Sequence, residues 1–198
     1  MPSAVNDLAA NERNLNSLST ITLVVTLTGV SMTFGALIVV FLMRGLQDLF
    51  WTQIRLPGIL WLSTVILVAS SFLFEYARKR LVAGEIEDFH RLITWTTGVG
   101  VLFLTTQVVA GAQVLQSVPT MTNNPHTWFI FLFAGLHALH IIAGLICFGV
   151  LWYRTRERAS GPKYQMGTRA AARAIGIFWH YMDCMWIVLF ALLIFWRR

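Results

Sequence analysis

Four side chains that could move protons or bind a metal fall in the last two apolar stretches of this sequence. The segment FWHYMDCMW, residues 178–186, places His180 and Asp183 three residues apart. The segment FLFAGLHALHIIAGL, residues 131–145, gives His137 and His140 the same spacing. Side chains three residues apart share one face of an α-helix. Such pairs suit an acid–base couple, a metal site or a hydrogen-bonded structural cluster, and we favour the structural cluster.

No metal or haem is expected on this chain. His137 and His140 point to similar faces of one helix and cannot be the two axial ligands of one haem. A di-iron bundle needs several carboxylates, whereas Asp183 is the only carboxylate deep in an apolar stretch. Cys147 and Cys184 are too few for a structural metal site, and we expect them to be buried, inert thiols.

The elements that must position these residues are membrane-spanning helices. The chain has 198 residues, of which 57% are hydrophobic and 12% charged, with a mean hydropathy of +0.66. That balance indicates an integral membrane protein and gives no reason to expect nucleic-acid binding. Continuous apolar runs of about 20 residues predict an all-α bundle of five spans. They cover residues 21–43, 58–77, 93–115, 128–153 and 174–196, behind a polar tail over residues 1–20.

The basic residues predict the orientation of the bundle. Of the 15 Lys and Arg residues, eleven fall in the tail, the second loop and the fourth loop, residues 154–173. The positive-inside rule places these segments in the cytoplasm, so the N-terminus is predicted to be cytoplasmic and the C-terminus outside. The tail carries one Arg and two acids, which does not fit a cationic signal peptide, and we expect it to be retained.

Depth along the spans suggests partners for the polar residues. At 1.5 Å per residue, Asp183 and His140 both lie near the middle of a bilayer core about 30 Å thick. We therefore predict that Asp183 bonds to His140 or His137, and that His180 extends this polar cluster. Glu75 is three residues before Arg78 and is predicted to pair with it. The side chains expected to face lipid or a partner subunit are Glu75, Arg78, Trp95, Gln107, Trp179 and Trp186.

Two motifs give the chain a family resemblance. Gly135, His137, His140 and Gly144 form a Gly-x-His-x-x-His pattern with a Gly four residues on, within an aromatic-rich run. The segment FWHYMDCMW follows in the last span as Trp-His-aromatic-x-Asp-x-x-Trp. Together these resemble subunit III of haem-copper oxidases, in its short five-helix form. Weaker similarities include the pair Ser70–Ser71 and the segment from Trp95 to Gln107.

The resemblance implies a non-catalytic subunit of a proton-pumping terminal oxidase in the plasma membrane of a prokaryote. It implies direct packing on subunit I, a complex with subunit II and with small subunits or a respiratory supercomplex, and bound phospholipid. Haem and copper are expected in the partner subunits, where oxygen is reduced to water. The cytochrome c oxidase branch is favoured. A quinol oxidase or a companion of nitric oxide reductase stays open, as does a small transporter or a haem-anchoring membrane subunit.

Two departures from the family pattern concern intramembrane glutamates. Gly29 and Val30 stand where the family often has a Ser-Glu pair, and Ala110 stands where it often has a Glu after Gln107. The Asp/His group is therefore the intact polar feature of this chain.

Overall fold

The protein is an all-helical bundle. The computed structural model describes the backbone of residues 2–47, 57–117, 125–156 and 162–195. The helices are α1 (Pro2–Gln47), α2 (Ile59–Ala83), α3 (Ile86–Ser117), α4 (Pro125–Arg156) and α5 (Pro162–Phe195). All five are long and apolar enough to cross a membrane. The predicted spans lie within these helices, apart from Gly58, which precedes α2, and Trp196, which lies outside the described residues.

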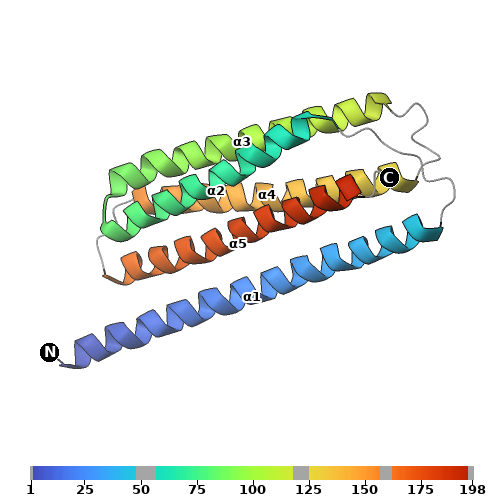
Figure 1. Ribbon diagram of the computed structural model, residues 1–198. Helices are drawn as coiled ribbons and strands as arrows, with labels where there is room; N and C mark the ends of the chain where they lie inside the picture. Colours follow the sequence, from blue (N-terminus) through green and yellow to red (C-terminus); the bar gives the residue numbers. More distant parts are fainter. Residues whose placement is uncertain (1, 48–56, 118–124, 157–161, 196–198) are drawn as a thin grey trace.

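The helices run farther than hydropathy alone indicates. The fourth loop, predicted over residues 154–173, is mostly helical, because α4 continues to Arg156 and α5 already begins at Pro162. Proline suits the first turn of a helix, where its missing N–H is not needed. The N-terminal tail is helical as well, and α1 with its 46 residues is about 69 Å long. Its N-terminal end extends past the neighbouring helices in Figure 1.

Helix α5 occupies the centre of the arrangement. It contacts α1, α2 and α4, while α3 contacts α2 and α4. Helices α2 to α5 therefore form a four-helix bundle, and α1 lies along one side of it (Figure 1). Consecutive helices run in opposite directions, so the N-terminus and the end of α5 lie at opposite ends of the bundle.

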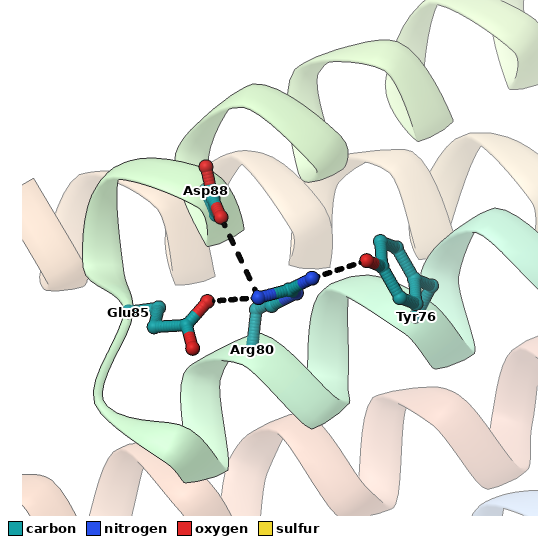
Figure 2. Close-up of polar contacts among 4 residues, drawn as sticks. All are labelled: Tyr76, Arg80, Glu85 and Asp88. Carbon is teal, nitrogen blue, oxygen red and sulfur yellow. Dashed lines mark hydrogen bonds and ion pairs between the residues drawn. The ribbon is translucent and has the colours of Figure 1, made fainter.

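The turn between α2 and α3 fixes the alignment of these two helices. Gly84 has a φ of 86°, and the N–H groups of Gly84 and Glu85 donate back to the carbonyls of Leu81 and Arg80. This is a Schellman motif, in which glycine takes the left-handed conformation without steric strain. Figure 2 shows Arg80 reaching from α2 to Glu85 and to Asp88, 3.7 Å away in α3, while also bonding to Tyr76.

The core of the bundle is aromatic. Phe74 of α2 stacks on Phe148 of α4 with ring centroids 4.8 Å apart, and Phe148 lies 4.6 Å from the ring of Trp179 in α5. All three side chains are fully buried. Since the bilayer is as apolar as these rings, their packing stabilises the bundle through close contact rather than through escape from water.

Candidate functional site

Asp183 is buried between α5 and α2. Only 6% of the residue is exposed. The hydroxyl of Ser71, on α2, donates a hydrogen bond to Asp183 Oδ2. The same hydroxyl lies 3.0 Å from Nδ1 of His180, one turn earlier on α5. Ser71 therefore bridges the imidazole and the carboxylate, and the three groups form one hydrogen-bonded unit.

The predicted bond from Asp183 to His140 or His137 is wrong. Within the described residues, Asp183 Oδ1 and both ring nitrogens of His137 have no hydrogen-bond partner. His140 Nδ1 donates to the Leu136 carbonyl on its own helix, at 2.6 Å. Depth along a helix axis gives only the height of a side chain in the membrane. The direction in which it points decides the partner, and Asp183 faces α2 rather than α4.

The two histidines of α4 lie among aromatic rings instead. His137 is 1% exposed, and its ring centroid is 5.2 Å from that of Trp186 and 6.0 Å from that of Phe103. His140 is half-buried, 5.6 Å from the ring of Phe34 in α1. The structure thus brings His180 and Asp183 together and leaves His137 and His140 outside their cluster.

Trp179 and Trp186 are internal residues, which corrects their predicted place facing lipid or a partner. They are 0% and 3% exposed. Trp179 Nε1 donates to Ser70 Oγ at 3.1 Å, and Trp186 Nε1 donates to Thr64 Oγ1 at 3.0 Å. A buried indole N–H usually finds a partner, and hydroxyls on a neighbouring helix supply it in an apolar surrounding.

These contacts define a polar seam between α2 and α5. The α2–α5 seam consists of Thr64, Ser70 and Ser71 on α2 and of Trp179, His180, Asp183 and Trp186 on α5. The two tryptophans are seven residues apart, as are Thr64 and Ser71. Seven residues are close to two helical turns, so each set stays on one face of its helix. This matching spacing is a sequence signal for the seam that our sequence reasoning missed.

A separate polar contact joins α2 to α3 through Gln107. Its Nε2 donates to Ser63 Oγ at 3.0 Å, and Ser63 is fully buried. Gln107 is half-buried and therefore belongs at least partly to the interior rather than to a surface facing lipid. Trp95 is 64% exposed on the outer side of α3.

Glycines make room for the seam where α3 and α4 meet it. A Cβ atom added at Gly144 of α4 would lie 2.9 Å from two carbons of the Trp179 ring. One added at Gly100 of α3 would lie 3.3 Å from the same ring and 2.7 Å from Leu145. Trp179 therefore fills a slot that only glycine leaves open on these two helices.

The pairing of Glu75 with Arg78 is confirmed. Arg78 Nη2 lies 2.6 Å from Glu75 Oε1, and Arg78 Nε lies 2.9 Å from Glu75 Oε2. Both side chains are about one third exposed. The bidentate geometry neutralises the carboxylate near one end of α2.

The remaining candidate ligands do not gather. Among the described residues, no three His, Cys, Asp or Glu side chains lie together in a way that could hold a metal ion. Cys147 and Cys184 are exposed on the outside of the bundle, which corrects the expectation that they are buried.

Comparison with known proteins identifies the family. The protein-family model described as Cytochrome c oxidase subunit III matches residues 44–198. These residues contain α2 to α5 and with them the whole α2–α5 seam. The chain belongs to the cytochrome c oxidase subunit III family. The resemblance first indicated by the Gly-x-His-x-x-His and Trp-His-aromatic-x-Asp motifs is thus confirmed.

Individual subunit III relatives agree. The chain is 29% identical to the cytochrome c oxidase subunit 3 of Thermostichus vulcanus, over 86% of this chain and 84% of that protein. It is 28% identical to a probable cytochrome c oxidase subunit 3 of Nocardia farcinica, over 68% of this chain and 64% of that protein. The cytochrome c oxidase subunit 3 of a Synechocystis species is 27% identical over 71% of this chain. The chain spans just under two thirds of the Nocardia protein and 56% of the Synechocystis protein.

Proposed function

We propose that this chain is the non-catalytic subunit III of a proton-pumping terminal oxidase of the cytochrome c oxidase branch, in the plasma membrane of a prokaryote. The observation that carries this proposal is the family match over α2 to α5. The relatives named above are bacterial proteins, which supports the plasma membrane as the location.

The geometry of the interior supports a role without a redox centre. Polar side chains of the seam bond to one another across helices. The α4 histidines do not offer a haem or copper a set of ligands, because His137 is enclosed by Phe103 and Trp186 and His140 bonds within its own helix. In this proposal haem and copper are held by the partner subunits, where oxygen is reduced to water.

The outer surface of the bundle supports packing on subunit I and binding of phospholipid. Large apolar side chains such as Met32, Phe72 and Val108 are at least 70% exposed in the single chain. Apolar surface at the depth of a membrane is covered either by lipid chains or by other membrane proteins. We assign one such face to subunit I, while subunit II, small subunits or a supercomplex complete the assembly.

The charge distribution supports a cytoplasmic N-terminus and an external C-terminus. The N-terminal end of α1, the α2–α3 turn and the start of α5 lie at one end of the bundle (Figure 1). The basic residues Arg78, Lys79, Arg80, Arg154, Arg156, Arg169 and Arg173 belong to the helix segments at this end. The positive-inside rule favours the cytoplasm for such an end.

Purification in mild detergent tests the proposal. Tagged at its N-terminus, the chain should bring down an oxidase whose haem spectrum belongs to other subunits, and the complex should oxidise cytochrome c. Oxidation of quinol instead would move the chain to the quinol oxidase branch. Haem retained by the separated chain, or the absence of any oxidase subunit from the preparation, would contradict the proposal.

A further inference from the structure

A row of polar groups leads from the edge of the bundle into the α2–α5 seam. Glu75 and Ser71 are four residues apart on α2 and so share a face, while His180 and Asp183 share a face of α5. Glu75, paired with Arg78, interacts electrostatically with His180. His180 is exposed, whereas Asp183 is buried. The row thus connects an imidazole on the outer surface of the single chain, within the membrane-spanning part of α5, with an enclosed carboxyl group.

Ser71 is placed so that the hydrogen bonds of this row can run in either direction. With Asp183 ionised, His180 Nδ1–H donates to Ser71 Oγ, and the Ser71 hydroxyl donates to Asp183 Oδ2. With Asp183 protonated, Oδ2–H donates to Ser71, whose hydroxyl then donates to Nδ1. A hydroxyl both donates and accepts, so the same three heavy atoms serve both arrangements.

The surroundings of Asp183 do not tie it to one protonation state. Oδ1 has no hydrogen-bond partner in the described part of the chain, so Ser71 alone supports the ionised form. On α4, neither ring nitrogen of His137 has a hydrogen-bond partner in that part of the chain. On the α1 side of α5, Tyr181 bonds to Ser31 at 2.5 Å and stays outside the row. Among the described residues Asp183 bonds only to Ser71, and a carboxyl group can meet a hydroxyl either as acceptor or, when protonated, as donor.

We propose that Ser71 is a proton-transfer bridge through which His180 loads and unloads a proton-binding site at Asp183. An external acid, such as hydronium, gives up a proton that forms an N–H bond at Nε2 of His180. The Nδ1 proton moves to Ser71 Oγ as the Ser71 proton moves to Asp183 Oδ2, so two N–H or O–H bonds break and two O–H bonds form. No electrons are exchanged, and one proton is gained overall.

This inference concerns the chain itself and holds whichever oxidase contains it. The test uses the full chain in lipid nanodiscs. After a rapid drop in pH, infrared difference spectroscopy follows the C=O stretch of a protonated carboxyl group, assigned to Asp183 by its loss in Asp183→Asn. The wild-type chain should develop this band.

The variants separate the bridge from simple packing. Ser71→Ala should slow the rise of the Asp183 band by about tenfold or more, since positioned proton donors and acceptors accelerate transfer by at least that much. Ser71→Thr keeps a hydroxyl and should restore the rate. Ser70→Ala, which removes the adjacent hydroxyl that bonds to Trp179 instead, is the matched control and should leave the rate unchanged.

His180→Asn tests the entrance without disturbing the core, because His180 is exposed. This variant should slow the rise of the Asp183 band as much as Ser71→Ala does. If Ser71→Ala does not fold, His180→Asn alone tests the proposal. The inference is overturned if Asp183 is protonated at the wild-type rate in His180→Asn, or if the rise of the Asp183 band is slowed as much in Ser70→Ala as in Ser71→Ala. It is also overturned if the wild-type chain shows no Asp183 band at any pH.

Discussion

The α2–α5 seam and the histidine pair of α4 look alike in the sequence and differ in the structure. Both place two titratable residues three apart in an apolar helix. In the seam, Asp183 and His180 share the hydroxyl of Ser71. In α4, His137 has no hydrogen-bond partner among the described residues and His140 bonds only to its own helix. The difference lies in the facing helix, since α2 presents hydroxyls to α5 whereas aromatic rings surround His137.

This contrast bears on how much each polar residue contributes to the stability of the bundle. Interhelical hydrogen bonds within membranes contribute about 0.6 kcal/mol on average and at most about 1.7 kcal/mol. The seam has several of them at matched spacing, together with a tryptophan packed against glycines. We therefore expect the seam, and not the α4 histidines, to hold the bundle together.

The largest effect is expected at the centre of the seam. Trp179→Ala removes a fully buried ring and its bond to Ser70, and should lower the free energy of unfolding by about 3–5 kcal/mol. Unfolding by dodecyl sulfate titration in detergent micelles measures it. Trp95→Ala, at an exposed tryptophan, is the matched control and should change little. Equal losses in the free energy of unfolding of the two variants would show that the seam contributes no more to stability than the exposed surface does.

A smaller loss is expected where α4 meets the seam. In Gly144→Ala, the added methyl would lie 2.9 Å from the Trp179 ring, and overpacking of this kind costs about 1–3 kcal/mol. Gly149→Ala changes the same helix where nothing lies within 4 Å of the new Cβ, so it should be neutral or slightly stabilising. Comparing the two in the same titration isolates the close approach. A neutral Gly144→Ala would show that Trp179 can shift at no cost.

The smallest effect is expected at the buried histidine of α4. His137→Leu removes two ring nitrogens that have no partner in the described residues, so no hydrogen bond is lost. Replacing an unpaired buried polar group by an apolar one of similar size is close to neutral or stabilising. We expect a change within about 1 kcal/mol in the same assay. A loss as large as that of Trp179→Ala would reveal a partner for His137 and break the contrast.

The sequence was sufficient for the five helices and for the Glu75–Arg78 pair. Long apolar runs and i,i+3 spacing are local properties, and both were read correctly. Hydropathy could not show that α1 starts at Pro2 or α5 at Pro162, because a helix continues past the bilayer without an apolar signal.

The partner of Asp183 could not be predicted from the sequence for a different reason. Estimated depth placed it level with His140, but depth does not give the rotation of α5. Ser70 and Ser71 entered the sequence analysis only as a weak family similarity, yet their hydroxyls bond to Trp179 and Asp183. The seven-residue spacing shared by Thr64 and Ser71 with Trp179 and Trp186 was the available signal.

A pair of double-mutant cycles tests the central claim most directly, that Asp183 is held by α2 and not by α4. One cycle combines Asp183→Leu with Ser71→Ala, and the other combines Asp183→Leu with His137→Leu, each followed by unfolding in detergent. We predict a coupling energy of about 0.6–1.7 kcal/mol between Asp183 and Ser71. Between Asp183 and His137 we predict none. Coupling to His137 with none to Ser71 would contradict the account.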